Sequence, residues 1–143
     1  AKYVSIDKGH MVFPEPSFTI FALIAEFLGM SKTIIPLQDN KKIDLEGMLK
    51  AIKSDTKLVY ICNPNNPTGD LLSRTEVESF ISKIPENVVV LIDEAYIEFT
   101  NQPSFSNLVN PYLEIFAFKF ELATILTLAI NSFSISSIPS YIF

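Results

Sequence analysis

Three short runs of apolar and β-branched residues constrain the fold of this chain more than any other feature. They occupy residues 33–37, 57–62 and 88–92, and a shorter apolar run lies at residues 11–13. A run that is apolar on both of its faces is typical of a strand in a parallel sheet that helices cover on both sides. Because the segments between these runs are long enough for helices, the sequence predicts an α/β fold.

Helix-capping signals mark the segments that join the predicted strands. Ser17 and Asp44 are suitable N-cap residues, and Gly29 is suitable for ending a helix. Ser73 and Glu76 have the spacing of a capping box, in which the hydroxyl caps the helix and the carboxylate bonds back to the cap residue. These signals predict helices over residues 18–27, 45–53 and 74 to about 82.

The composition excludes several classes of site. Eleven basic and sixteen acidic residues give a net charge of −5, which argues against nucleic-acid or anionic-membrane partners. The apolar stretch at residues 115–130 contains two charges and is shorter than the roughly 20 residues of a membrane span. With one cysteine and one histidine, we expect no internal disulfide and no metal site. We predict that His10 lies at the surface and that Cys62 packs as a small apolar side chain.

Polar residues follow two of the predicted strands, where ligands bind in parallel sheets. Residues 63–69 read NPNNPTG, and its two Asn-Pro steps predict a tight loop in which one cis bond would be unsurprising. Its asparagines either satisfy local backbone groups or face a ligand. Residues 93–99 read DEAYIEF. A carboxylate at the end of a buried strand needs a partner, so Asp93 either meets a cationic ligand or caps the next segment, while Tyr96 could equally be a core aromatic.

Together the two loops resemble those of the fold-type I pyridoxal phosphate aminotransferases of class I and II. Residues 14–18, PEPSF, resemble the family segment that places an aromatic ring over the cofactor. The similarity covers about residues 9–109 and is greatest to the histidinol-phosphate aminotransferase branch. It implies a partial three-layer α/β/α large domain with a mostly parallel sheet, pyridoxal 5'-phosphate as cofactor, a small amino-acid-type substrate, a homodimer and a cytoplasmic location. The implied reaction moves an amino group between L-histidinol phosphate and 2-oxoglutarate.

The resemblance also implies roles for four residues at the cofactor. The aspartate at the position of Asp93 pairs with the pyridine nitrogen and keeps it protonated. The asparagine at Asn66 and the tyrosine at Tyr96 hydrogen-bond the phenolic oxygen of the cofactor ring. The aromatic residue at Phe18 stacks on the face of that ring.

The sequence departs from the family where the catalytic lysine is expected. Members carry a Ser-Lys pair followed by glycine and arginine, whereas residues 116–123 here read FAFKFELA. Lys119 falls in this window without those neighbours, so we interpret it as an incidental charge and assign no catalytic residue. Arg74 is the only arginine of the chain; we expect it to be a solvated residue of a helix cap rather than a phosphate anchor.

The character of the chain changes near Asn110. Residues 1–109 carry 24 of the 27 charged residues and all four glycines. We therefore divide the chain into a partial cofactor-binding domain, residues 1–109, and an unassigned tail, residues 110–143, which we interpret as an out-of-frame translation. Three alternatives to the histidinol-phosphate reaction stay open: a catalytically inactive truncated fragment, a related branch acting on another amino acid, and an intact small enzyme that uses Lys119.

Overall fold

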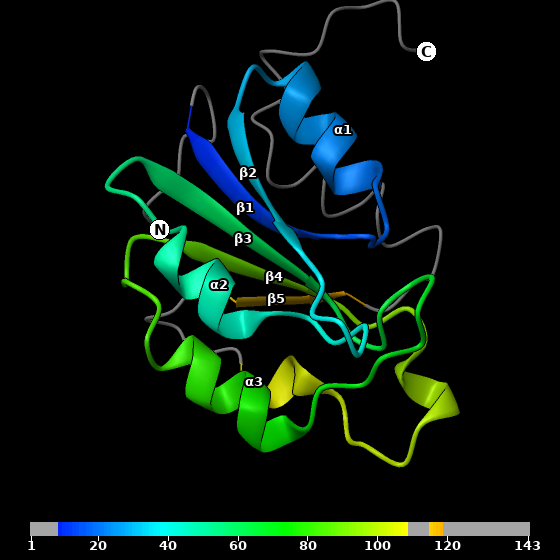
Figure 1. The fold of residues 1–143 in the computed structure, drawn as a ribbon. Coiled ribbons are helices and arrows are strands. Elements are labelled where there is room, and N and C mark those ends of the chain that lie inside the picture. Colours follow the sequence, from blue (N-terminus) through cyan, green and yellow to red (C-terminus); the bar gives the residue numbers. More distant parts are fainter. Residues whose placement is uncertain (1–8, 109–114, 119–143) are drawn as a thin grey trace, which may run out of the picture.

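A five-stranded sheet forms the centre of the part of the chain that the structure describes (Figure 1). The structure is a computed structural model, and it describes residues 9–108 and 115–118. The strands lie in the order β2-β1-β3-β4-β5, and each neighbouring pair is parallel. The elements are β1 His10–Glu15, α1 Ile20–Phe27, β2 Ser31–Pro36, α2 Leu45–Lys50, β3 Thr56–Cys62, α3 Arg74–Ile81, β4 Val89–Asp93, the 3-10 turns η1 Ile97–Phe99 and η2 Phe105–Leu108, and β5 Ile115–Phe118.

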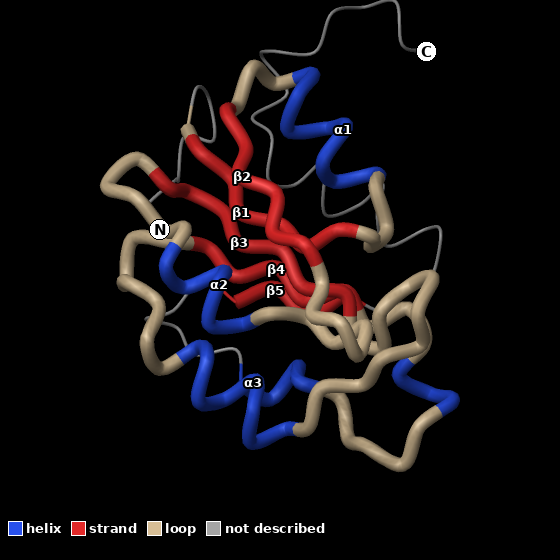
Figure 2. The backbone as a smooth tube through the Cα atoms, in the orientation of Figure 1, coloured by secondary structure: helices blue, strands red, loops and turns tan. Residues whose placement is uncertain are grey.

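Helices cover both faces of this sheet, which confirms the predicted α/β fold. In Figures 1 and 2, α1 lies on one side of the strands, and α2 and α3 lie on the other. Alternate residues of a strand point to opposite faces, and the core divides accordingly. The cluster on the side of α2 and α3 includes Val12, Met48, Val59, Ile61, Phe80, Val90 and Ile92. The α1-side cluster consists of Met11, Phe13, Ala22, Ala25, Met30, Tyr60, Cys62 and Leu91.

The start of α1 differs from the prediction. The helix begins at Ile20 after Thr19, whose side chain makes no capping hydrogen bond, so the prediction of Ser17 as N-cap is wrong. Ser17 is buried and its hydroxyl donates instead to Asn65, 48 residues away. The helix ends as predicted: Gly29 has φ +71°, and the amides of Gly29 and Met30 bond back to Glu26 and Ala25. A left-handed residue at this point favours glycine.

The first of the three predicted strands is less buried than its composition suggests. β2 lies at the edge of the sheet, and its residues are exposed or only partly buried. Ile34 retains 39% of its accessible surface. The expectation of a buried strand at residues 33–37 is therefore wrong within the described part of the chain, whereas β3 and β4 are buried as predicted.

Helices α2 and α3 begin at the N-cap residues that the sequence predicted. The Asp44 carboxylate accepts a hydrogen bond of 3.0 Å from the amide of Gly47. At α3 the amide of Glu76 donates to the Ser73 hydroxyl (3.3 Å), and the Ser73 amide donates to the Glu76 carboxylate (2.7 Å). These bonds satisfy amides that a helix start would otherwise leave unpaired, which confirms the predicted capping box.

Part of the predicted tail adds a strand to the sheet. β5 pairs with β4 in parallel, with Asp93 opposite Phe118. Residues 1–8, 109–114 and 119–143 lie outside the described residues, and Lys119 is among them. The boundary at residue 109 and the out-of-frame origin of residues 110–143 stay predictions.

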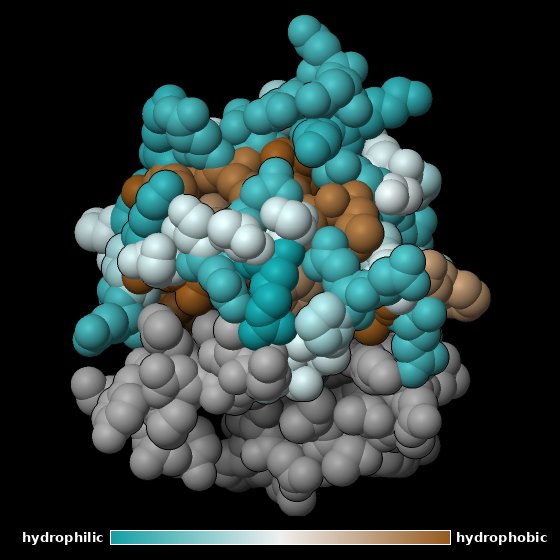
Figure 3. Space-filling model, turned by 90° about the horizontal axis from the view of Figure 1, so that it is seen from below, coloured by the Kyte–Doolittle hydropathy of each residue, from teal (hydrophilic) through white to brown (hydrophobic). Residues whose placement is uncertain are grey.

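The outer face of α3 is polar, as expected for the outside of a helical layer. Thr75, Glu76, Glu78 and Ser79 are exposed, while Val77 and Phe80 are buried against the sheet. Figure 3, which views the molecule from below, shows hydrophilic residues over much of the described part of this face, with hydrophobic residues visible between them. Among the described residues, no helix has both the length and the apolar character needed to cross a membrane.

Candidate cofactor site

Three loops converge where adjacent strands of the sheet end. They follow β1, β3 and β4, which are neighbours in the strand order. The loop after β1 carries Phe18, the loop after β3 carries the NPNNPTG segment, and the turn after β4 carries Tyr96. Because all the strands are parallel, their carboxyl ends share one edge of the sheet. The fold therefore brings the predicted site segments to a single region.

Asp93 ends β4 as a buried carboxylate. It retains 3% of its accessible surface, and it lies two residues after Leu91, on the α1 side of the sheet. One oxygen, Oδ1, accepts a hydrogen bond of 3.0 Å from the amide of Ala95, which is the local turn contact considered from the sequence. Burial raises the pKa of Asp93 above its usual value, and the hydrogen bonds from Ala95 and Tyr60 oppose that rise.

Tyr60 is a site neighbour that sequence reasoning missed. Its hydroxyl donates to Oδ2 of Asp93 at 3.0 Å. Burial raises the pKa of Tyr60, and the nearby charge of Asp93 contributes to the rise. The two-residue period of β3 could have revealed this contact, because Tyr60 and Cys62 share a face and Cys62 is directly opposite Asp93.

Cys62 is buried, as predicted. Its thiol donates to the carbonyl of Pro64 at 3.2 Å. Burial, with the nearby Asp93 charge, raises the pKa of the Cys62 thiol to about 11. The thiol is therefore protonated at neutral pH, which makes it a poor nucleophile.

The three asparagines of NPNNPTG have different environments. Asn63 is buried and exchanges two hydrogen bonds with the backbone of Leu72, at 2.8 and 3.1 Å. Asn65 is buried and bonds to Pro16, Ser17 and Thr68. Asn66 is only partly buried. Local bonding therefore accounts for Asn63 and Asn65, and among the described residues no hydrogen bond holds the Asn66 side chain, which leaves it available to a ligand. Both Asn-Pro bonds of the loop are cis.

Phe18 and Tyr96 occupy different settings near this edge. Phe18 is partly buried and packs against the α1-side cluster, the side on which Asp93 lies. Tyr96 is 46% exposed, and its ring centroid is 6.4 Å from that of Phe99. The alternative of a core position for Tyr96 is therefore wrong. The structure places Phe18 and Asp93 on one face of the sheet, with Asn66 and Tyr96 in the loops next to them.

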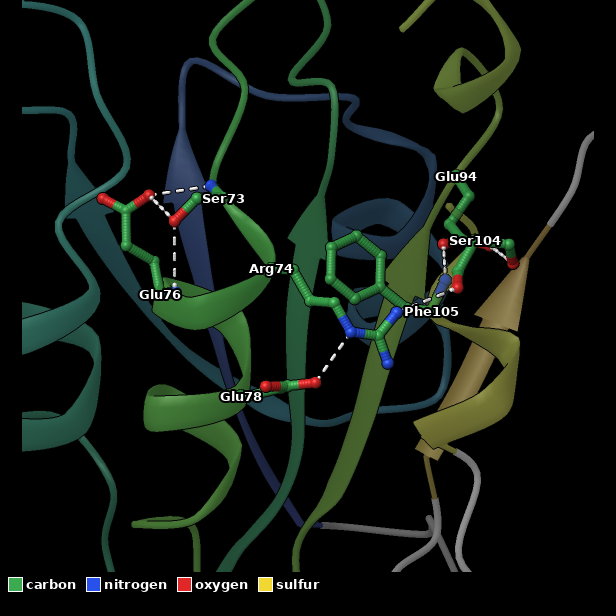
Figure 4. Close-up of polar contacts among 7 residues, drawn as sticks. All are labelled: Ser73, Arg74, Glu76, Glu78, Glu94, Ser104 and Phe105. Atoms are coloured by element: carbon green, nitrogen blue, oxygen red, sulfur yellow. Dashed lines mark hydrogen bonds and ion pairs between the residues drawn. The ribbon is translucent and has the colours of Figure 1, made fainter. Parts of the chain in front are cut away.

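Arg74 and Glu94 make contacts with residues 104–105 on the α2 and α3 side of the sheet, opposite to the α1 side on which Asp93 lies. Arg74 pairs with Glu78 at 2.7 Å, and its guanidinium lies 5.8 Å from the centre of the Phe105 ring. Glu94 is 1% exposed and accepts hydrogen bonds from the Ser104 hydroxyl and the Phe105 amide (Figure 4). Arg74 thus lies in the first turn of α3, next to the helix cap as predicted, and its side chain retains 27% of its accessible surface while packing on Phe105.

His10 is buried, whereas the sequence predicted a surface position. It is 1% exposed, and its two ring nitrogens lie 2.8 Å from the hydroxyls of Thr56 and Thr33. Burial lowers the pKa of His10. The prediction of a surface position fails because the hydroxyl partners come from two other strands. In the ranges 9–108 and 115–118, no group of three or more potential ligand residues could hold a metal ion.

Comparison with known proteins identifies the family. The family profile "Aminotransferase class I and II" matches residues 4–134. The chain belongs to the class I and II aminotransferases. Membership confirms the resemblance drawn from the loop motifs and makes the chain part of a family of pyridoxal phosphate enzymes.

Relatives of the aminotransferase chain carry the name of one branch. A histidinol-phosphate aminotransferase of Staphylococcus carnosus is 52% identical over 71 residues, which are 50% of this chain and 20% of that protein. Histidinol-phosphate aminotransferase 1 of Idiomarina loihiensis is 40% identical over 93 residues, 65% of this chain and 25% of that protein. The chain thus spans about a quarter of the length of these curated relatives.

Solved structures of the same branch share the fold. The histidinol-phosphate aminotransferase of Clostridium acetobutylicum matches with a TM-score of 0.68 and 32% identity, over 76% of this chain and 33% of that one. The enzyme of Sinorhizobium meliloti, solved in complex with pyridoxal-5'-phosphate, matches with a TM-score of 0.61 and 30% identity, over 66% of this chain and 26% of that one. These matches confirm the predicted α/β architecture.

Proposed function

We propose that the carboxyl edge of β1, β3 and β4 binds pyridoxal 5'-phosphate. The observation that carries this proposal is the buried Asp93 carboxylate, which lies on the same face of the sheet as Phe18. In the neighbouring loop Asn63 and Asn65 are hydrogen-bonded to other residues, which leaves Asn66 available. A buried carboxylate with two neutral donors retains lone pairs for a cationic N–H. This donor set fits the aromatic part of the cofactor.

Each proposed residue has a distinct task. Asp93 accepts the pyridinium N–H and keeps the ring nitrogen protonated, because an opposite charge in a buried site favours the charged form. Phe18 packs against the ring face. Asn66 and Tyr96 hold the phenolic oxygen. The bound cofactor supplies an electron-withdrawing ring that stabilises negative charge on the substrate carbon.

The proposed reaction is amino transfer between L-histidinol phosphate and 2-oxoglutarate. The names of the relatives support this substrate, as do the two structural matches from the same branch. We further propose that the full-length enzyme is a cytoplasmic homodimer. The alternative substrate branch has support from a tyrosine aminotransferase of Leishmania infantum, which matches with a TM-score of 0.56 and 26% identity, over 63% of this chain and 25% of that one.

Whether this chain transfers amino groups by itself depends on a lysine. Lys119 lies outside the described residues and lacks the neighbours that the family places around its lysine. A chain without a lysine amine in the site would bind the cofactor without transferring amino groups. The two alternatives therefore differ in one bond: the small enzyme requires a covalent bond between Lys119 and the cofactor, and the inactive fragment does not form one.

Cofactor binding is the first test. Equilibrium dialysis of the chain against pyridoxal 5'-phosphate should show saturable binding, and Asp93→Ala should weaken it about ten- to hundredfold, the value of one charge-assisted hydrogen bond. Glu46→Gln on the exposed surface of α2 is the control. No binding, or equal binding by Asp93→Ala, would contradict the cofactor site.

Borohydride reduction followed by peptide mapping then separates the alternatives. A modified Lys119 supports the small-enzyme alternative, and an unmodified one rules it out. For substrate, the full-length enzyme should form glutamate from 2-oxoglutarate with L-histidinol phosphate as amino donor. Faster transfer from tyrosine would favour the aromatic branch.

A further inference from the structure

The buried hydroxyl of Tyr60 is the side-chain donor to Asp93. The two atoms, Tyr60 Oη and Asp93 Oδ2, lie 3.0 Å apart across β3 and β4. The second oxygen of Asp93 accepts from the amide of Ala95, also at 3.0 Å. Among the described residues, each carboxylate oxygen therefore has one fixed donor, and the pair of donors sets both the plane and the direction of the group.

Aromatic packing prevents the Tyr60 hydroxyl from moving away. Tyr60 has no accessible surface. Its ring centroid lies 4.9 Å from that of Phe21 on α1 and 6.4 Å from that of Phe13 on β1. A ring enclosed by neighbours from two other elements has little rotational freedom, so the position of its hydroxyl is determined by the core and not by solvent.

Neighbouring groups do not replace this donor. Cys62 is directly opposite Asp93 in the sheet, but its thiol is bonded to the carbonyl of Pro64. Tyr60 and Cys62 are the charged or titratable side chains that interact with Asp93 in the described structure. The phenol is thus the side chain that orients the carboxylate.

We propose that Tyr60 is a positioning residue for the cofactor, because it fixes Asp93 in the orientation that presents a free lone pair to the pyridine nitrogen. This inference rests on the proposed cofactor site. It assigns a task to a residue within the apolar KLVYIC strand. Tyr60 acts through Asp93 and does not itself touch the cofactor.

Tyr60→Phe tests this assignment, because it removes the hydroxyl and keeps the ring. We expect pyridoxal 5'-phosphate to bind about tenfold more weakly, the value of one hydrogen bond to a charged group. With ¹⁵N-labelled cofactor, the ring nitrogen should lose its proton at a lower pH than in the wild-type chain. Ile61→Val is the matched control, since it is a conservative change at a buried residue of the same strand whose side chain packs on the opposite face, and it should leave the ring nitrogen unchanged.

A measurement without cofactor separates this proposal from the proposed function. Carboxyl ¹³C resonances of the chain, titrated with pH, should show a higher pKa of Asp93 in Tyr60→Phe than in the wild type, because a donor to the charged form is lost. Failure of the wild-type chain to bind pyridoxal 5'-phosphate would reject the proposed function, and with it the cofactor that Tyr60 is proposed to position, while a shifted Asp93 titration in Tyr60→Phe would still show that Tyr60 holds the carboxylate. An unchanged Asp93 titration in Tyr60→Phe would reject the positioning role.

Folding of the variant is checked by circular dichroism. If Tyr60→Phe does not fold, 3-fluorotyrosine incorporation keeps the ring and makes the hydroxyl a stronger donor. The Asp93 resonance should then titrate at a lower pH than in the unsubstituted chain. No change in that resonance would overturn the proposal.

Discussion

Asn65 and Asn66 are adjacent, yet we predict that their substitution by alanine affects different properties: Asn65→Ala lowers the stability of the fold, and Asn66→Ala weakens cofactor binding. The Asn65 side chain is 2% exposed. It accepts from the Ser17 hydroxyl at 2.7 Å and donates to the Pro16 carbonyl at 3.1 Å and the Thr68 hydroxyl at 2.8 Å. It therefore joins the loop that carries Phe18 to the loop that carries Asn66.

The magnitude follows from these bonds. A typical intramolecular hydrogen bond contributes about 1 kcal/mol to the free energy of unfolding, and Asn65→Ala removes three of them. It also leaves the buried Ser17 hydroxyl without this acceptor. We expect a loss of about 3 kcal/mol. Asn66 is only partly buried, so Asn66→Ala should change the free energy of unfolding by less than about 0.5 kcal/mol.

Urea unfolding followed by circular dichroism measures both variants, and equilibrium dialysis measures their affinity for pyridoxal 5'-phosphate. Asn66→Ala should weaken cofactor binding while the chain stays as stable as the wild type. Equal unfolding free energies for the two variants would refute the reasoning, because they would show that the bonds of Asn65 do not hold the loops together.

Three further predictions concern other buried or capping groups. Burial lowers the pKa of His10 below 6.5, so the neutral ring stabilises the fold above pH 6.5, and this contribution should be lost as the pH falls from 6.5 toward the folded-state pKa. Urea unfolding over that pH range measures the loss, and His10→Gln is the control that should not respond to pH. Ser73→Ala breaks the capping box and should lower the free energy of unfolding by about 1 kcal/mol; no loss in urea unfolding would contradict the cap. Glu94→Ala removes the acceptor of the Ser104 hydroxyl and the Phe105 amide, so hydrogen exchange at the Phe105 amide should become faster, and unchanged exchange would show that the bond is dispensable.

The sequence predicted the elements whose signals are local. The helix start at Asp44 and the capping box at Ser73 depend on residues three positions apart, so a short stretch of sequence contains all the information. The buried strands β3 and β4 follow in the same way from consecutive apolar residues. The β2 prediction failed because burial depends on place in the sheet, and β2 is at its edge.

Part of the candidate site could likewise be predicted. Parallel strands place their carboxyl ends at one edge, so the loops after β3 and β4 were expected to meet, and the structure brings them together. The family resemblance pointed to Asn66, but local sequence patterns alone could not indicate which asparagine stays available. That depends on Ser17 of the loop after β1, which engages Asn65, and the same long-range bond displaces the predicted start of α1.

By itself, then, the sequence determined the α/β class, the capped starts of α2 and α3, and the motif pair that identifies the aminotransferase family. Tertiary structure alone decided that His10 is buried between Thr33 and Thr56, and that Tyr60 bonds to Asp93. The physical reason is the separation of the partners along the chain: these bonds join residues 23, 46 and 33 positions apart. Such contacts depend on which strands become neighbours, and strand order is set by packing of the whole sheet rather than by any local pattern.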